Sequence, residues 1–197
     1  AEGLTEPASG RVAFLGEDSG DRQADAYKGY DAVFAKGKAV EVACWAHTRR
    51  KFWEARGSDG LRSARMLVEI QKLYEIEHQA KEQGLPPEQI RELRQKKAKP
   101  ILEQIEALLK AWTQEVLPQS PIRDAIGYAR GQWAALNRYI EDGILSADNN
   151  LAERVLRTVA VGRNNWLFFG ADSGGRRAAI IYSLVASCRL CKKDPFA

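Results

Sequence analysis

One stretch of the sequence sets a carboxylate among cations and amides at the start of an expected helix. It runs Asp148-Asn149-Asn150-Leu151-Ala152-Glu153-Arg154-Val155-Leu156-Arg157. Asp148 is a good N-cap for this helix, because its side chain can accept from backbone N–H groups of the first turn. Asn149, Glu153 and Arg157 follow at four-residue spacing and share one face. The pattern suits a metal-binding acid beside a phosphate backbone, and the structural alternative is a surface helix with an ordinary Glu–Arg pair.

A second candidate acid is Asp25, at the end of a short expected strand over residues 21–25. Only the fold can bring Asp25 close to Glu153, because the two lie far apart in the sequence. Neighbouring carboxylates repel each other, and a divalent cation such as Mg²⁺ (or Mn²⁺) relieves that repulsion. Two such ions can activate an attacking oxygen and stabilise a leaving one. The alternative role for Asp25 is a helix N-cap before Ala26.

Two basic clusters contain aromatic residues, a combination that can neutralise phosphates and stack on bases. The first is Cys44-Trp45-Ala46-His47-Thr48-Arg49-Arg50-Lys51-Phe52-Trp53, in which His47 could also donate to a scissile phosphate. Its alternative is a strand end whose Trp and Phe side chains pack inward while the cations are merely solvated.

The second cluster follows the Glu153 helix and contains Gly162-Arg163-Asn164-Asn165-Trp166. The local chemistry places Arg154, Arg157 and Arg163 in contact with phosphates. Trp166 is expected to pack beside the site or against DNA. The residues expected to contact DNA, in the two clusters and in the segment that carries Glu153, are His47, Arg49, Arg50, Asn149, Arg154, Arg157, Arg163 and Trp166.

A zinc site is a weaker possibility that the sequence leaves open. Cys44-x-x-His47 and Cys188-x-x-Cys191 together supply four residues of the types that bind zinc. The alternative is that these three cysteines are ordinary thiols. An odd and sparse set of cysteines also argues against a disulfide framework and favours a reducing compartment.

The overall composition is that of a globular protein with a mildly basic balance. Hydrophobic residues make up 45% of 197 residues, the formal net charge is +4 and the sequence pI is about 9.0. This balance is compatible with a nucleic-acid partner but does not establish one. No signal peptide and no apolar run long enough for a membrane span is recognisable, so we expect no membrane partner.

The periodicity of apolar residues predicts an α/β (α+β) chain with a long helical block. Alternating residues over 39–46 predict a strand, and residues 57–143 carry helical patterns only, interrupted at 84–87 and 117–121. Pro100 is expected to kink or split one of these helices. Residues 122–140 and 177–189 predict two further helices. The expected partition is a first part of the core at 1–56, an all-helical insertion at 57–143 and the remainder of the core at 144–197.

Four motifs in order resemble the bacterial transposases of insertion-sequence family 66. Besides the cluster at 44–52 they are Asp25-Ala26-Tyr27-Lys28-Gly29-Tyr30, Ser146-Ala147-Asp148-Asn149-Asn150-Leu151-Ala152-Glu153-Arg154 and Gly162-Arg163-Asn164-Asn165-Trp166-Leu167-Phe168. The resemblance runs from about Leu15 to Phe196. It implies a partial RNase-H-like catalytic core that carries an Asp-Asp-Glu triad.

Within that triad, the resemblance makes Asp25 the second acid and Glu153 the third, and both would hold Mg²⁺ (or Mn²⁺). The first Asp of the family lies upstream of the motifs in this chain, so the chain is expected to be inactive alone and incomplete at both ends. The implied activity is metal-dependent cleavage and transfer of DNA strands at transposon ends and target. A homo-oligomer on DNA in the bacterial cytoplasm, associated with the nucleoid, is expected. The alternative is a non-catalytic relic that binds DNA or a protein partner.

Overall fold

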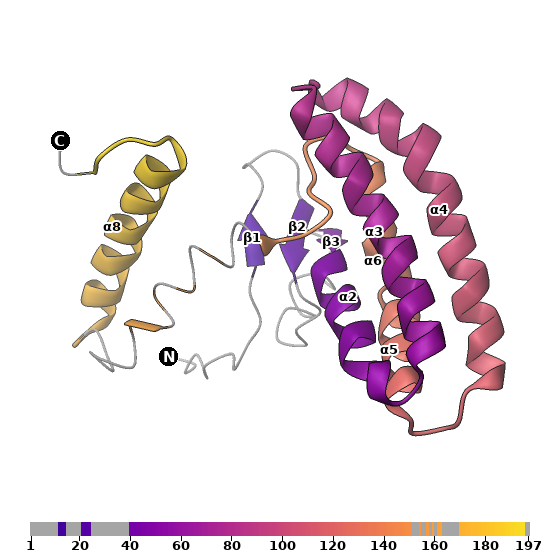
Figure 1. Ribbon diagram of the computed structural model, residues 1–197. Helices are drawn as coiled ribbons and strands as arrows, with labels where there is room; N and C mark the ends of the chain where they lie inside the picture. Colours follow the sequence, from indigo (N-terminus) through magenta and orange to yellow (C-terminus); the bar gives the residue numbers. More distant parts are fainter. Residues whose placement is uncertain are drawn as a thin grey trace. The chain divides into compact units, whose positions relative to one another are not determined.

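The computed structural model describes residues 12–14, 21–24, 40–150, 154, 157, 159, 161–162 and 170–195 (Figure 1). The chain divides into two compact units, Ala1–Asn149 and Asn150–Ala197. The expected partition at residues 56 and 143 is a different division and stays a prediction.

Helices dominate the described residues. The first unit contains α2 (Trp45–Glu54), η2 (Ala55–Gly57), α3 (Gly60–Glu82), α4 (Pro87–Glu115), α5 (Pro121–Gly131), α6 (Trp133–Asn137) and η3 (Arg138–Ile140), and the second contains α8 (Asp172–Leu190). The described strands are short: β1 (Val12–Phe14), β2 (Asp21–Ala24) and β3 (Val40–Val42). The prediction of an α/β (α+β) fold with a partial RNase-H-like core is therefore wrong, since the described chain is mostly helical.

The strand expected over residues 39–46 shows why that prediction failed. Only Val40–Val42 is extended, and helix α2 begins at Trp45. Trp45, Thr48 and Phe52 recur at helical spacing, and all three are buried. Burial of this helical face outweighs the two-residue alternation, which continues by coincidence through Cys44 and Ala46.

The three strands form one small sheet in the order β1-β2-β3. Strand β1 pairs antiparallel with β2, with Val12 opposite Ala24, and β2 pairs parallel with β3, with Asp21 opposite Val40. The strand expected at 21–25 is therefore present as β2. Asp25, the acid that follows it, lies outside the described residues.

Helices α3 and α4 form the long hairpin that the helical pattern of residues 57–143 predicts. Asp59 caps α3 by accepting from the backbone N–H of Arg62 at 3.0 Å, and α3 ends before Gly84, whose φ of +59° is readily adopted by glycine. Pro87 then opens α4 at a position where its missing N–H does no harm.

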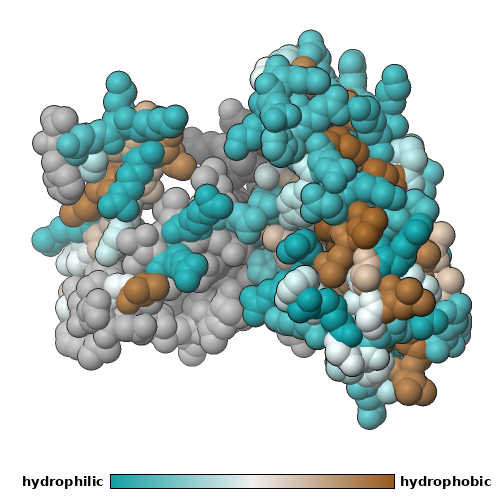
Figure 2. Space-filling model, in the orientation of Figure 1, coloured by the Kyte–Doolittle hydropathy of each residue, from teal (hydrophilic) through white to brown (hydrophobic). Residues whose placement is uncertain are grey.

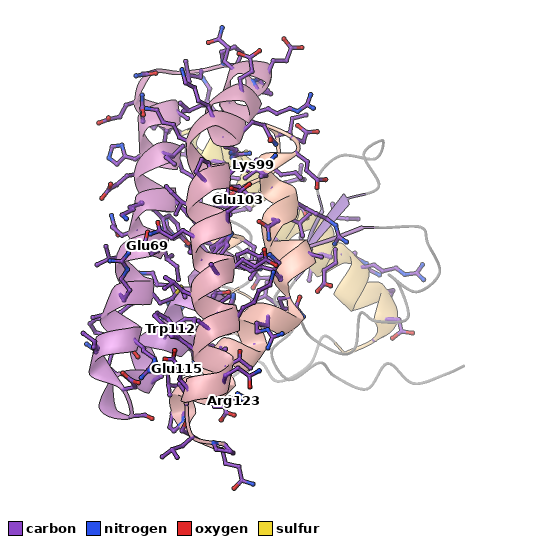
Figure 3. All side chains as sticks on the ribbon, turned by 90° about the vertical axis from the view of Figure 1, so that its right-hand side faces the viewer. Glu69, Lys99, Glu103, Trp112, Glu115 and Arg123 are labelled. Atoms are coloured by element: carbon purple, nitrogen blue, oxygen red, sulfur yellow. The ribbon has the colours of Figure 1, made fainter. Side chains whose placement is uncertain are left out.

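Pro100 does not split α4, which continues from Pro87 to Glu115. Pro100 is exposed, so the backbone carbonyl that loses its partner lies on the solvent side of the helix. The opposite face is buried through Leu102, Ile105 and Leu109, and this packing holds the helix together. Figure 3 shows Lys99 and Glu103 beside this position on α4.

The core of the first unit lies where α2, α3, α4 and α5 meet. Its largest fully buried side chains include Trp45, Phe52, Met66, Ile70, Leu73, Ile105, Leu109, Ile126, Leu136 and Tyr139. Hydrophilic residues cover much of the outer surface of α3 and α4, and a band of hydrophobic residues runs where they meet (Figure 2). Helix packing therefore supplies most of the stability of this unit.

A buried arginine ties the end of this helical block to the hairpin. Arg94 of α4 is 2% exposed, and its guanidinium bonds Glu77 of α3 at 2.8 and 2.6 Å. The same group donates to the backbone oxygens of Tyr139 and Asp142 at 2.7 and 2.8 Å. Next to it, a Cβ on Gly143 would lie 1.8 Å from the backbone oxygen of Pro87. These contacts position the segment that leads to Asp148.

Two expected helices differ from their prediction. Residues 122–140 form three short helices, α5, α6 and η3, because the chain turns at Gln132 between the first two. Helix α8 starts five residues earlier than residue 177 and contains no fully buried residue. Its expected inner positions Ile181 and Leu184 are 61% and 62% exposed. Over the described residues, no helix combines the length and apolar character needed to cross a bilayer.

Candidate functional site

The amino end of α2 lies against the segment 146–149, so two of the motifs expected to carry function are neighbours. The backbone N–H of Trp45 donates to the carbonyl oxygen of Ala147 at 3.0 Å. The backbone N–H of Asn149 approaches the thiol of Cys44 closely enough to affect its ionisation. Tertiary packing therefore joins residues that are about a hundred positions apart in the sequence.

Cys44 sits at the N-cap of α2 and is fully buried, without a disulfide bond. The pKa of this thiol is raised to about 11, chiefly by burial; the carboxylate of Asp148 also raises it, and N–H groups of Asn149, His47 and Ala46 lower it. The thiol is therefore protonated near neutral pH. A protonated, buried thiol is a poor metal ligand and a poor nucleophile.

Asp148 also faces helix α3 through Tyr74. Burial raises the pKa of the Tyr74 phenol, and the charge of Asp148 adds to that effect, whereas Arg49 opposes it. Cys44, Tyr74, Asp148 and Arg49 thus lie within electrostatic reach of one another. The phenol remains neutral and can donate a proton in a hydrogen bond.

An open cleft of about 890 Å³ adjoins this cluster. Its walls come from the second half of α3, the turn between α3 and α4, and the 146–148 segment. The lining residues are Gln71, Tyr74, Glu75, Glu77, His78, Ala80, Lys81, Glu82, Gly84, Leu85, Ile90, Ser146, Ala147 and Asp148. Asp148 is therefore accessible from solvent while its neighbour Asn149 is 2% exposed.

The basic cluster at 44–53 divides between the two faces of α2. Trp45 and Phe52 are both 0% exposed and pack inward, as the structural alternative for this cluster predicts. Arg49 and Arg50 lie on the exposed face, where the Nε of Arg50 contacts Oε1 of Glu54 at 2.9 Å. His47 is half-buried near the amino end of the helix. The helix thus presents cations to solvent while its large aromatic residues, Trp53 excepted, build the core.

The remaining expected site residues fall into three groups. Asp25, Glu153, Arg163 and Trp166 lie outside the described residues. Arg154 and Arg157 are helical and exposed in the second unit, as phosphate contacts require. Asn149 is described but enclosed, and the burial of its amide does not favour a direct contact with DNA.

The zinc ligands considered from the sequence are not brought together within either unit. Cys44 and His47 belong to the first unit, and Cys188 and Cys191 belong to the second. In the parts of the chain that the structure describes, no group of three or more His, Cys, Asp or Glu side chains is placed to hold a metal ion. The described residues therefore give no support to a zinc site.

Sequence patterns alone did not single out Tyr74 or Arg56. In the sequence, Tyr74 is one of several apolar residues at helical spacing, and only its proximity to Asp148 distinguishes it. Arg56 follows Trp53 by three residues, and its guanidinium lies 3.0 Å from the centre of the indole ring. That three-residue spacing was the available signal.

Comparisons with known proteins define the class of this chain as a transposase-related protein. Residues 9–177 match the family described as "Transposase IS66 family". The chain belongs to this family, and the resemblance noted from its motifs is confirmed.

Three relatives come from Sinorhizobium fredii and are described only as uncharacterized proteins. The chain is 33% identical to y4hP over 192 residues, covering 89% of this chain and 34% of the relative. It is 32% identical to y4jD, covering 93% and 37%, and 32% identical to y4qI, covering 90% and 34%. The chain thus spans about a third of the length of these relatives. No solved structure matches it.

Proposed function

We propose that this chain is part of the catalytic region of a transposase that cleaves and joins DNA strands. The observation that carries the proposal is the family match over residues 9–177, a range that includes both Asp25 and Glu153. The exposed cations of α2 and of Arg154 and Arg157 support it, because phosphate neutralisation dominates the affinity of proteins for DNA.

Asp25 and Glu153 are proposed as the second and third acids of an Asp-Asp-Glu triad whose first Asp lies on an earlier part of the parent protein. Two carboxylates form a donor set that suits Mg²⁺ (or Mn²⁺), which also accepts water and phosphate oxygens. When bound, such an ion supplies charge stabilisation for phosphodiester chemistry. Both acids lie outside the described residues, so their separation is part of the proposal.

The proposed reaction has two transfers at phosphorus. A water oxygen attacks the phosphodiester at the transposon end, forms a new P–O bond and releases a 3′-hydroxyl. That hydroxyl then attacks a phosphodiester of the target DNA, and a target 3′-hydroxyl leaves. Arg154, Arg157 and Arg163 hold the phosphates of the reacting strands, together with His47, Arg49 and Arg50. Trp166 packs beside the site or on DNA.

The proposal includes the setting in which this chemistry takes place. The parent protein acts on DNA in the bacterial cytoplasm, associated with the nucleoid. It works as a homo-oligomer, because two transposon ends must be held during joining. Sedimentation of the protein with and without transposon-end DNA measures this assembly directly.

The test is Glu153→Gln in the full-length parent protein, with strand cleavage, strand joining and DNA binding measured separately. Cleavage and joining should be lost while binding is retained, because the substitution removes a charge without changing the size of the side chain. Glu103→Gln is the matched control, since Glu103 is exposed on α4 (Figure 3). Undiminished cleavage by Glu153→Gln contradicts the metal-ligand role. DNA binding without any cleavage by the unaltered protein indicates a non-catalytic relic.

A further inference from the structure

The exposed face of α2 and η2 carries an aromatic ring among cations. Trp53 follows Arg49 by four residues and Arg50 by three, and Arg56 follows Trp53 by three, so both arginines of α2 and Arg56 lie beside Trp53. Phe52, on the other side, is fully buried. Of these two neighbouring aromatic residues, Phe52 therefore packs in the core and Trp53 lies at the surface.

Trp53 is presented to solvent although the first unit has an extensive core. It is 48% exposed, with the guanidinium of Arg56 stacked 3.0 Å from its ring centre. Arg56 is held there by a second contact, since its Nε donates to the backbone oxygen of Trp53 at 2.7 Å. A Trp and Arg pair of this kind, partly open to solvent, offers a flat apolar surface next to a fixed positive charge.

The surface around Trp53 has an excess of positive charge. Glu54 is the only acidic residue in the sequence from 45 to 57, against Arg49, Arg50, Lys51 and Arg56. Glu54 pairs with Arg50 at 2.9 Å. Asp59, the next acid along the chain, pairs with Arg62 at 2.7 Å. These two acids are thus each paired with a cation, and the surplus of cations over acids in residues 45–57 favours an anionic partner.

We propose that Trp53 and Arg56, together with Arg49 and Arg50, form a binding surface for single-stranded DNA. A base stacks on the indole, and the guanidinium groups contact the phosphates on either side. Single-stranded DNA fits better than a duplex, because the bases of a duplex are stacked on one another and do not offer a face to a side chain. The proposal rests on the DNA-directed function proposed above, and it assigns to α2 the strand that is unpaired during cleavage and joining.

The test measures binding of a fluorescently labelled oligonucleotide, single-stranded or annealed to its complement, by the 197-residue chain. Trp53→Ala should weaken single-strand binding roughly tenfold or more, whereas Trp53→Phe should retain most of it because a ring remains. Arg56→Ala should reduce the dependence of log affinity on log salt concentration by about 0.7. The matched control is Leu117→Ala, which alters another exposed apolar residue, 77% exposed, between α4 and α5.

Each other outcome overturns the proposal in a recognisable way. Equal single-strand affinities for Trp53→Ala and the unaltered chain remove Trp53 from the surface, as does an absence of single-strand binding by the unaltered chain. An equal loss of duplex affinity excludes base stacking. A change in oligomeric state without a change in DNA affinity assigns the surface to a second copy. None of these binding results changes the expected outcome of the strand-cleavage test with Glu153→Gln. The proposed function and the proposed single-strand surface can therefore fail independently.

Discussion

The indole N–H of Trp45 donates a buried hydrogen bond of 3.0 Å to the backbone oxygen of Leu136. Its backbone N–H bonds Ala147 at the same distance, and its ring meets that of Trp133 edge to face with centroids 6.1 Å apart. A single residue at the start of α2 thus contacts both the short helices and the segment that leads to Asp148. Residues 146–149 take their position next to Cys44 through these contacts.

Trp45→Phe should therefore lower the free energy of unfolding by roughly 1–3 kcal/mol, because the carbonyl of Leu136 loses a buried donor. The smaller ring also leaves unfilled volume beside Trp133. Denaturant unfolding measures the change. Trp53→Phe, at the exposed neighbouring aromatic position, is the control and should stay within about 0.5 kcal/mol of the unaltered protein. Equal effects of the two substitutions would contradict the buried packing of Trp45 against Leu136 and Trp133.

Arg94→Met should destabilise the chain by about 3–5 kcal/mol, because it removes one partner of a buried ion pair. Glu77 would keep its charge in a site where its side chain is 21% exposed, and the backbone oxygens of Tyr139 and Asp142 would lose their donor. The measurement is again equilibrium unfolding. Arg91→Met, at an exposed position on the same helix, should have little effect.

Arg94→Lys should not restore the stability, since a lysine ammonium cannot make the paired contact with Glu77 and reach both backbone oxygens at once. Full stability in Arg94→Lys would show that only the positive charge matters at this position.

Gly143→Ala should cost roughly 1–3 kcal/mol, because the new Cβ would lie 1.8 Å from the backbone oxygen of Pro87. Backbone atoms cannot move aside as a flexible side chain can, so the loop before Ser146 must shift. Thermal unfolding combined with amide hydrogen exchange in 139–149 measures both effects. Gly127→Ala is the control. It lies inside α5 with open space around it, and there alanine should stabilise the helix by roughly 0.5–1 kcal/mol.

The stability of the chain should fall with rising pH in alkaline solution because of Cys44. Its pKa is raised from 9.0 to about 11 in the folded protein, so the unfolded chain loses this proton first. The contribution of the protonated Cys44 thiol to the free energy of unfolding is fully present below pH 9. It is lost as the pH rises to about 11. The loss amounts to roughly 1–3 kcal/mol in total.

The measurement is the difference in unfolding free energy between the unaltered chain and Cys44→Ala across that range, because the tyrosines contribute equally to both. Thiol labelling of the native chain at pH 8 gives an independent check. The exposed Cys191 should react well before the buried Cys44. Rapid labelling of Cys44 would show that the amino end of α2 opens in solution.

Patterns that operate within one element could be predicted from the sequence. The α3–α4 hairpin follows from apolar residues at helical spacing and from the break at 84–87, and strand β2 was expected at its place. The family could also be recognised from four short motifs in order. Fold class could not, because strand-like alternation before Trp45 extends into residues that are helical. Residues 39–46 alternate as in a strand, whereas Trp45, Thr48 and Phe52 recur at helical spacing. Local spacing does not show which face of a segment will be buried, and it was the burial of these three residues that favoured the helix.

The amino-acid sequence by itself determined the helical character of residues 57–143 with its breaks at 84–87 and 117–121, the clustering of cations in residues 49–56 and the family to which the chain belongs. Only tertiary structure decided that Cys44 meets Asn149, that Tyr74 meets Asp148 and that Trp53 points outward while Phe52 points inward. The physical reason is the distance along the sequence over which each kind of interaction acts. Helix propensity, caps and turns act over a few neighbouring residues, whereas these contacts join positions that meet only after the apolar faces of four helices have packed.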